Sequence, residues 1–313
     1  MVLSGSDLAY ALKIVLGDSS SGPLPAAEVS AEDELTCTTL LLSFILAKLL
    51  SPMATSTPAK SKPKVLKFDS EEDVAVAVAK YTADLSEKYI KEKGSFSVVL
   101  SGGTLIDTLR KLVEPPYLES VDWSKWLIFW VDERVVPLDH EDSNYLLAWR
   151  GFLSKVSIPS SNIYAINDKK SPEDAANEYE ERVKHLVENK IIPICDTTGC
   201  PKFDLMLLGM GPDGHVASLF PTRQQRHEKE KWVTFITDSP KPPPPRITFT
   251  FPVINSASEI AMVITGAELA DTVKLALGDG HGSDSGSTPL PAAEVSAEKE
   301  LVWFLDKDAA SKM

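Results

Sequence analysis

Cysteine is scarce in this 313-residue chain: there are three residues, and their spacing forms no regular framework. An odd number of this kind is typical of reduced thiols in an intracellular protein rather than of a disulfide scaffold. Cys195 and Cys200 lie close together in the sequence, but no second pair completes a zinc site with them. We therefore expect the cysteines to take no part in the chemistry, and we expect no metal centre.

Long apolar runs are also lacking. The strongly apolar stretch near the start, Leu40 to Leu50, is shorter than the roughly 20 residues that a membrane helix needs, and Lys48 interrupts it. Signal peptides begin with a basic region and an early apolar run, and transit peptides are poor in acidic residues. Here the acidic residues that precede the run are Asp7, Asp18, Glu28, Glu32, Asp33 and Glu34. These features predict a cytoplasmic protein that does not bind membranes.

Positive charge is in short supply, with 32 Lys and Arg against 45 Asp and Glu and a formal net charge of −13. Nucleic acids and anionic membranes are therefore not expected as main partners. A protein this acidic needs a local basic pocket if it is to bind a phosphate group, so individual arginines are informative. The hydrophobic content of 43% supports a packed core, and nothing in the composition suggests global disorder.

The first 52 residues repeat part of the C-terminal tail. The segment Pro23 to Glu32 recurs identically as Pro289 to Glu298, and the copy is too partial for a solenoid. We interpret residues 1–52 as an N-terminal extension that partially duplicates the tail. Residues 53–64 are a polar, proline-punctuated linker, and residues 65–313 are a single domain. The alternative is that the extension packs against the domain as an added element.

From residue 65 onward, expected strands alternate with expected helices. The strands are Val65–Phe68, Phe96–Leu100, Trp126–Val131, Leu205–Leu208, Trp232–Ile236, Ile247–Phe251, Ile260–Ile264 and Leu301–Leu305. The helices run from a capping-box start at Ser70 to about Lys93, and over Leu105–Leu112, Asn144–Ser154, Pro172–Glu188 and Ala267–Leu277. This alternation implies a mainly parallel sheet covered on both faces. We expect a doubly wound, Rossmann-like α/β fold.

One stretch organises the rest of the chain. The apolar run Leu205 to Leu208 has the length and character of a buried strand. Three glycines follow it that let the backbone turn sharply and approach a ligand closely: Gly209, Gly211 and Gly214. Val216 to Leu219 is expected to be the first turn of a helix, so that His215 lies near a helix N-terminus. Ligands of open α/β sheets bind at the carboxyl ends of the strands, where this junction falls.

Three interpretations of this junction compete. The first is a structural turn in which the histidine has no special role. The second is a dinucleotide site, because Gly209 to Gly214 matches G-x-G-x-x-G, although that fingerprint should open the first βαβ unit and be followed by an acidic residue about 20 positions on. The third is a sugar-phosphate site with His215 as general base. An imidazole with a reference pKa of about 6.5 is suited to deprotonating water near neutral pH.

Two further polar motifs follow expected strands. Ser101-Gly102-Gly103-Thr104 lies between a strand and a helix, where backbone N–H groups and hydroxyls can bind an anion, although in isolation an ordinary turn is the simpler interpretation. Asp132-Glu133-Arg134 ends another strand. Its arginine suits recognition of carboxylate or phosphate, and its aspartate can orient a neighbour or act as a base. The alternative is that all three charges are simply solvated.

Single residues complete the set of candidates. Asn144 begins an expected helix and can act as a cap. Arg246 follows four prolines that form a stiff connection and directly precedes an expected strand. It is the best candidate for a phosphate-binding cation, with a surface arginine as the alternative. Asp279-Gly280-His281 imitates the central motif but follows no buried strand, so we expect no role for it. The absence of a G-x-S-x-G elbow counts against an α/β-hydrolase esterase.

In this order the motifs resemble those of the 6-phosphogluconolactonases of the glucosamine-6-phosphate isomerase/deaminase superfamily, with the plant cytosolic members most alike. The elements that carry the resemblance are Leu100-Ser-Gly-Gly-Thr104, Val131-Asp-Glu-Arg-Val-Val-Pro137, Asp142-Ser-Asn144, Gly209-Met-Gly-Pro-Asp-Gly-His-Val-Ala-Ser-Leu-Phe-Pro221, Trp232-Val-Thr-Phe-Ile-Thr-Asp-Ser-Pro240, Arg246-Ile-Thr-Phe-Thr250 and Trp303-Phe-Leu-Asp306. The resemblance covers the chain from about residue 65 to its C-terminus.

The resemblance implies hydrolysis of 6-phosphoglucono-δ-lactone to 6-phosphogluconate in the oxidative pentose phosphate pathway, without a metal or cofactor. It implies that His215 is the general base that activates water and that Asp213 holds the loop or the imidazole. Arg134 would contact the substrate and stabilise charge that develops on the lactone oxygen, and Asp132 belongs to the same catalytic set. The residues expected to bind the substrate or its phosphate are Ser101, Gly102, Gly103, Thr104, Asn144, Gly211 and Arg246.

The chain departs from the resemblance at two positions. Family members commonly have a lysine where this chain has Leu269, and arginine or a neutral residue where it has Glu294; Lys274, about one turn after Leu269, offers a partial substitute. An impaired paralogue or a sugar-phosphate sensor on the same fold is therefore the alternative to an active lactonase. Deamination of glucosamine 6-phosphate is less expected, because Phe220 stands where those enzymes carry a glutamate after the histidine. The sequence makes no prediction of oligomeric state.

Overall fold

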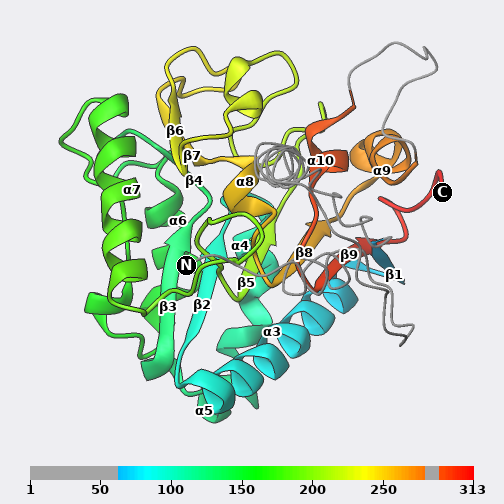
Figure 1. Ribbon diagram of the computed structural model, residues 1–313. Coiled ribbons are helices and arrows are strands. Elements are labelled where there is room, and N and C mark those ends of the chain that lie inside the picture. The colour runs from blue at the N-terminus through cyan, green and yellow to red at the C-terminus, as the bar shows by residue number, and fades with distance from the viewer. Residues whose placement is uncertain (1–62, 279–288) are drawn as a thin grey trace, which may run out of the picture. The chain divides into compact units, whose positions relative to one another are not determined.

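The main sheet has six parallel strands in the order β1-β9-β8-β5-β2-β3. We describe the protein from a computed structural model, which covers residues 63–278 and 289–313 (Figure 1). The strands of this sheet are β1 (Lys64–Phe68), β2 (Phe96–Leu100), β3 (Trp126–Trp130), β5 (Leu205–Leu208), β8 (Glu259–Ile264) and β9 (Glu300–Asp306). The expected parallel sheet, and each of these strands to within a residue or two, is confirmed.

Helices cover both faces of this sheet. On one face lie α3 (Glu71–Lys93), α4 (Thr104–Thr108) and α6 (Asn144–Gly151), and on the other lie α7 (Pro172–Glu188) and α9 (Ala270–Leu277). Strand alternation separates the two cores: Val98 and Leu100 of β2 pack toward α3, whereas Val99 packs toward α7. In Figure 1 the long helix α3 runs below the strands and the long helix α7 lies to their left. The doubly wound α/β architecture is therefore confirmed.

Local signals set the ends of the long helices. Ser70 caps α3 by accepting a hydrogen bond from the N–H of Asp73, and Gly94 ends it with a φ of 82°. The remaining short helices are α5 (Tyr117–Ser120), α8 (Phe251–Ile254) and α10 (Pro291–Glu294), with 3₁₀ turns at Leu109–Val113, Trp123–Lys125, Leu153–Lys155, Ser160–Asn162, Gln224–His227 and Ala267–Leu269. We expected continuous helices over Leu105–Leu112, Asn144–Ser154 and Ala267–Leu277. Each of them consists instead of a shorter α-helix with a 3₁₀ turn after it or, for α9, before it.

A second, antiparallel sheet lies on the α7 side of the core. It consists of β4 (Asp132–Arg134), β7 (Arg246–Phe249) and β6 (Val233–Ile236), in that order. The alternation of strands and helices did not distinguish β6 and β7 from strands of the main sheet. Asp132–Arg134 was expected to end the preceding strand and instead forms a strand of the second sheet. The expected strand over Ile247–Phe251 is also displaced, because Phe251 already begins α8 and Pro252 occupies its first turn.

The order of the strands fixes where a ligand can bind. From β2 the sheet grows in one direction to β3 and in the other to β5, β8 and β9. Such a switch point leaves a crevice above the carboxyl ends of the neighbouring strands. The turn after β2, the β4 segment after β3, the glycine-rich loop after β5 and the residues after β8 all lie at this edge. The fold therefore brings the separate motifs of the sequence together.

Some predictions fall on residues 1–62 and 279–288 and so lie outside the described residues. They are the N-terminal duplicate, most of the linker, and the absence of a role for His281. Within the part of the chain that the structure covers, no helix combines the length and the apolar character needed to cross a membrane.

Candidate active site

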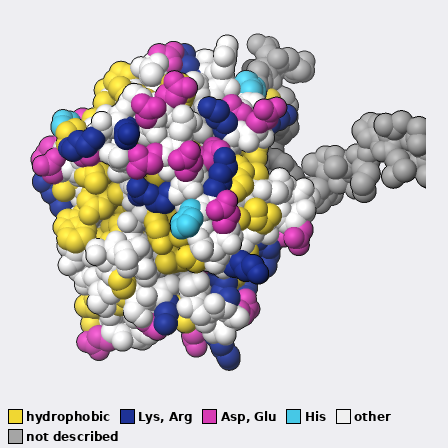
Figure 2. All heavy atoms as spheres, turned by 60° about the vertical axis from the view of Figure 1, so that its left-hand side comes forward, with side chains coloured by type: hydrophobic (Ala, Val, Ile, Leu, Met, Phe, Trp, Pro, Cys, Tyr) yellow, Lys and Arg dark blue, Asp and Glu magenta, His cyan; other side chains and the backbone are white. Residues whose placement is uncertain are grey.

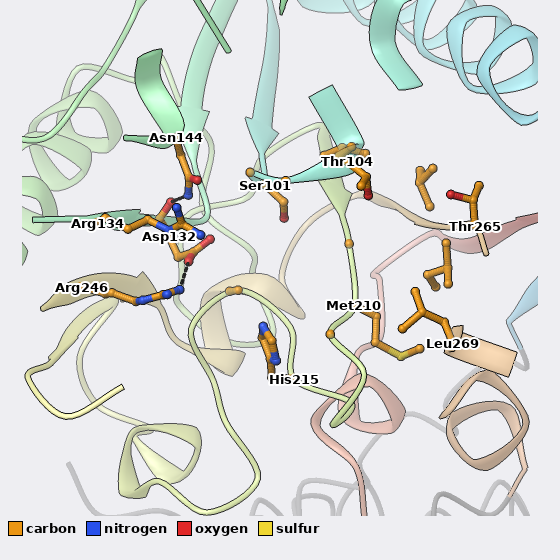
Figure 3. A pocket seen from close by; sticks show the side chains of 18 residues that line it. Ser101, Thr104, Asp132, Arg134, Asn144, Met210, His215, Arg246, Thr265 and Leu269 are labelled. Atoms are coloured by element: carbon orange, nitrogen blue, oxygen red, sulfur yellow. Dashed lines mark hydrogen bonds and ion pairs between the residues drawn. The ribbon is translucent and has the colours of Figure 1, made fainter. Parts of the chain in front are cut away.

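A pocket of about 190 Å³ opens at the carboxyl ends of β8, β5, β2 and β3. Every residue that the sequence nominated for the site lines it, except Asp213, which is hydrogen-bonded to His215. The lining residues are Ser101, Gly102, Gly103, Thr104, Leu105, Asp132, Arg134, Asn144, Gly209, Met210, Gly211, His215, Ala217, Arg246, Val263, Ile264, Thr265 and Leu269. Segments more than 100 residues apart in sequence thus form one polar cavity (Figure 3).

His215 and Asp213 form a hydrogen-bonded pair. Nδ1 of His215 lies 2.5 Å from Oδ1 of Asp213. Burial opposes ionisation of Asp213, but the hydrogen bond and charge interaction with His215 outweigh it, so the pKa of Asp213 lies below its usual value. An ionised Asp213 favours the tautomer with the proton on Nδ1 and leaves Nε2 to accept a proton from water. The pair has the arrangement of a general base and its orienting carboxylate.

The loop that follows His215 does not begin a helix, so our expectation for Val216–Leu219 is wrong. The two ends of this segment pair with each other in a tight turn, and Ala217 has a φ of 52°. The cause is tertiary structure. The N–H of Ser218 donates to Oγ1 of Thr248 in β7, and this contact directs the chain toward the second sheet.

Two distant segments hold the turn that precedes His215. The hydroxyl of Thr272 in α9 donates to the carbonyl oxygen of Pro212 over 2.8 Å. The N–H of Ala292 in α10 donates to the carbonyl oxygen of Gly214 over 3.0 Å. Gly214 has a φ of 78°, a conformation that favours glycine. The position of the imidazole therefore depends on α9 and α10 as well as on β5.

Asp132 is held by neighbours from the second sheet and the His215 loop. Its Oδ2 accepts a hydrogen bond from Oγ of Ser218 over 2.7 Å and lies 3.8 Å from Nη1 of Arg246. Figure 3 shows this carboxylate and guanidinium facing each other at the pocket wall. Asp132 is 6% exposed, and its position is therefore fixed before any ligand binds.

Arg246 is the first residue of β7 rather than the residue before the strand, and it is 3% exposed. Burial lowers its pKa, and the charge of Asp132 opposes that shift. Its Nε and Nη2 donate to backbone carbonyl oxygens of the preceding loop, those of Lys241, Pro242 and Pro243. Most of its hydrogen-bonding capacity thus fixes this loop, and Nη1 is directed toward Asp132 and Ser218.

Three buried polar atoms around the pocket have no partner among the described residues: Oγ of Ser101, Nε of Arg134 and Oδ1 of Asn144. Buried polar groups are nearly always hydrogen-bonded in proteins. The side chains of Arg134 and Asn144 are otherwise anchored, since Nη1 of Arg134 donates to the carbonyl oxygen of Asp142 and Nδ2 of Asn144 donates to that of Asp132. Oγ of Ser101, Nε of Arg134 and Oδ1 of Asn144 therefore lack the partner that a buried polar atom normally has.

The pocket has a charged end and a neutral end. In Figure 3, Arg134, Asp132, Asn144 and Arg246 gather at one end, Thr104, Thr265, Met210 and Leu269 at the other, and Ser101 and His215 lie between them. Thr265 and Met210 were missed in the sequence. Thr265 follows the apolar strand β8 directly, a position that in this sheet order could have marked it.

The two departures from the family pattern lie in different places. Leu269 lines the neutral end of the pocket. Glu294 lies in α10 and forms an ion pair with Arg226, whose side chain is fully buried, so its charge is balanced there. Lys274 is exposed on α9 and does not line the pocket. The structure thus leaves Leu269 as the departure that bears on ligand binding.

Charge of both signs is interspersed on the face of the molecule in Figure 2. The net negative charge therefore forms no continuous acidic field on this face that would repel an anionic substrate. Within residues 63–278 and 289–313, no group of three or more His, Cys, Asp or Glu side chains is arranged to hold a metal ion.

Known proteins resemble this chain over most of its length. Residues 69–303 match the family described as glucosamine-6-phosphate isomerases/6-phosphogluconolactonase. The chain is 61% identical over 250 residues to a protein of Oryza sativa subsp. indica named probable 6-phosphogluconolactonase 4, chloroplastic, which covers 80% of this chain and 76% of that protein. It is 56% identical over 266 residues to 6-phosphogluconolactonase 3, chloroplastic, of Arabidopsis thaliana, covering 85% and 80% of the two chains.

A solved structure shows the same fold. The crystal structure of 6-phosphogluconolactonase from Thermotoga maritima superposes with a TM-score of 0.66 at 31% sequence identity, over 79% of this chain and 100% of that chain.

Proposed function

The chain belongs to the family of glucosamine-6-phosphate isomerases and 6-phosphogluconolactonases, and from this premise we propose that it hydrolyses 6-phosphoglucono-δ-lactone to 6-phosphogluconate. This is the lactone-opening step of the oxidative pentose phosphate pathway. The observation that carries the proposal is the 2.5 Å His215–Asp213 pair at a pocket that Arg134 also lines. A site that only bound a sugar phosphate would have no need of an oriented base.

The reaction needs a nucleophile and a way to open the ring. Nε2 of His215 takes a proton from a water molecule, whose oxygen attacks the lactone carbonyl carbon. The tetrahedral intermediate then expels the ring oxygen, which takes the proton back from Nε2 of the His215 imidazolium and leaves as a hydroxyl group. The carboxylic acid that forms loses its own proton to solvent and becomes a carboxylate. Asp213 stabilises the imidazolium that forms in between. General-base assistance of this kind typically contributes about 10²–10⁴-fold to a rate.

Charge on the carbonyl oxygen is stabilised by donors at the charged end of the pocket. Nε of Arg134 is buried and unpaired, so it can donate to an oxyanion without first giving up another partner. Preorganised donors of this type act mainly on charge that is present in the transition state. Asp132 orients Arg246 and the Ser218 loop around this end.

The phosphate would be bound by the turn Ser101 to Thr104 with help from the charge of Arg246, and Asn144 and Gly211 would contact the rest of the substrate. Oγ of Ser101 is unpaired at this wall and can donate to a phosphate oxygen, whereas Oδ1 of Asn144 is an acceptor and suits a hydroxyl group of the sugar. Gly102 lets the turn pass so close to Asn144 that a side chain would overlap the amide. Arg246 retains only Nη1 for such a contact, since its other nitrogens are bound to the proline loop. Its contribution is therefore mainly the field of its charge.

Deamination of glucosamine 6-phosphate is disfavoured by Phe220. This side chain is fully buried, and its ring centroid lies 4.5 Å from that of His215. An apolar ring thus occupies the space beside the base in which a ring-opening acid would be needed.

The test is hydrolysis of freshly generated 6-phosphogluconolactone by the full chain, measured above the spontaneous rate, with His215→Ala alongside. Acceleration that disappears in the variant supports both the activity and the base. If wild-type protein gives no acceleration but binds 6-phosphogluconate, the impaired-paralogue or sensor alternative replaces the proposal.

We also propose that the protein acts in the cytoplasm. The support is the acidic character of the residues that precede the apolar run at Leu40 to Leu50. Because two relatives carry the word chloroplastic in their names, imaging of a fluorescent protein fused to the C-terminus of the full chain decides the compartment.

A further inference from the structure

We propose that Glu133 is the positioning residue for the charged end of the pocket, acting through Arg134 and Asn144. The inference rests on the proposed lactonase activity and deepens it. Glu133 is the middle residue of β4, so its side chain points away from the pocket while those of Asp132 and Arg134 line it. It is 2% exposed, and the mechanism above gives it no role.

The polar contacts of Glu133 lead to two residues that line the pocket, Arg134 and Asn144, and to their neighbours at the start of α6. Oε1 accepts the backbone N–H of Arg134 over 2.7 Å and that of Asn144 over 2.8 Å. Oε2 accepts the backbone N–H of Tyr145 over 2.7 Å and faces the hydroxyl of Ser143 at 3.4 Å. One carboxylate therefore joins β4 to the first turn of α6.

This junction determines where two unpaired ligand-binding atoms lie. Asn144 reaches back to donate to the carbonyl oxygen of Asp132, and Arg134 donates to the carbonyl oxygen of Asp142 just before α6. If the start of α6 moves relative to β4, both Oδ1 of Asn144 and Nε of Arg134 move with it. Displacements of about 1 Å in catalytic groups can cost about 10²-fold in rate.

A carboxylate is the group that suits this position. Each of its oxygens can accept more than one hydrogen bond, and three of the four donors are backbone N–H groups that cannot reverse their role. Burial raises the pKa of Glu133 to about 7, although the three backbone hydrogen bonds oppose that shift. Burial of a carboxylate costs free energy. The hydrogen bonds that hold Arg134 and Asn144 in place give a reason for a carboxylate at this position.

The experiment is Glu133→Gln in the full chain. The amide has nearly the same shape, but its NH₂ group must face N–H donors at either Oε1 or Oε2, so one of the two connections is lost. We expect kcat for 6-phosphogluconolactone to fall about tenfold or more and KM to rise about threefold or more. Unfolding of a fraction of the protein would lower the apparent kcat but leave KM unchanged, so the rise in KM separates positioning from loss of folded protein.

Glu259→Gln is the matched control. Glu259 is also a buried carboxylate, 4% exposed, and its pKa is also raised by burial. It begins β8, at the end of the sheet opposite the pocket, where it binds Tyr89 and Lys88. We expect this variant to keep both kinetic constants within about twofold of wild type.

A second readout does not depend on turnover. Titration calorimetry with 6-phosphogluconate should show affinity weakened about threefold or more in Glu133→Gln and unchanged in Glu259→Gln, even if the wild-type protein fails to hydrolyse the lactone. Should Glu133→Gln not fold, Glu133→Asp is measured in its place. The shorter side chain keeps the charge, but its carboxylate can no longer reach the N–H groups of both β4 and α6. Wild-type KM and wild-type product affinity in a folded variant at position 133 would overturn the proposal, and so would equal losses in the Glu259 variant.

Discussion

Gly211→Ala should displace the catalytic base while leaving the fold intact. An added Cβ at Gly211 would lie 2.1 Å from Cε1 of His215, where ordinary van der Waals contacts begin at 3.4 Å. The imidazole would therefore have to move by more than 1 Å. The backbone of Gly211 does not have a positive φ, so alanine is conformationally allowed and the effect is one of space.

The expected result is a fall in kcat of about 100-fold, because a displacement of 1 Å in a catalytic group costs about that much. The thermal midpoint should change little, since the imidazole can move into the adjoining pocket. The assay is lactone hydrolysis at saturating substrate, with thermal unfolding measured on the same samples.

Gly209→Ala serves as the comparison. It adds the same methyl group two residues earlier in the loop, and no atom lies within 4 Å of the new Cβ. Its effect on kcat should be at least tenfold smaller than that of Gly211→Ala. Equal losses in the two variants would refute the reasoning, because they would show that loss of pocket space, rather than displacement of His215, limits the rate.

Three further predictions concern charge. Asp213→Asn should lower kcat about tenfold or more at neutral pH, because the amide can accept the Nδ1 hydrogen bond but does not stabilise the imidazolium of His215; an unchanged kcat would exclude the orienting role. Leu269→Lys should lower KM about tenfold, or about 1.4 kcal/mol, by placing a cation at the neutral end of the pocket, and an unchanged KM would show that the phosphate binds elsewhere. Because the folded-state pKa of Glu133 is raised from 4.5 to about 7, the stability it contributes is present below pH 4.5 and is lost as the pH rises through 7. Thermal midpoints of wild type should therefore fall, relative to those of Glu133→Gln, between pH 4.5 and 7.

The strands of the parallel sheet could be predicted from the sequence because each is short and mostly apolar. Leu205 to Leu208 is buried along its whole length, as its composition indicated. Parallel order then places the carboxyl ends together, which is why the motifs after β2, β3 and β5 could be assigned to one site. The second sheet could not be separated in this way, since nothing in the run Val233–Ile236 distinguishes an antiparallel partner of β7 from a strand of the main sheet.

The errors arose where tertiary contacts outweigh local preference. Val216 to Leu219 has a composition that suits a helix, but Ser218 is bonded to Asp132 and Thr248 in the second sheet. Arg246 was expected to precede the strand but is its first residue, and the burial of its guanidinium among backbone carbonyl oxygens depends on how the proline loop folds over it. No motif or spacing in the sequence indicates the contacts of Ser218 or those of Arg246.

The duplicated tail segment shows why the same residues need not have the same function. In its C-terminal copy, Ala292 holds the carbonyl of Gly214, and Glu294 neutralises the buried Arg226. The partners Gly214 and Arg226 lie outside the repeated segment, and neither is supplied by residues 1–52. The segment can therefore support the His215 loop only where it packs against Gly214 and Arg226. Substitutions of Arg226 should therefore lower the activity that depends on His215, although Arg226 does not line the pocket. They remove the ion pair with Glu294 and so release the segment whose Ala292 holds Gly214.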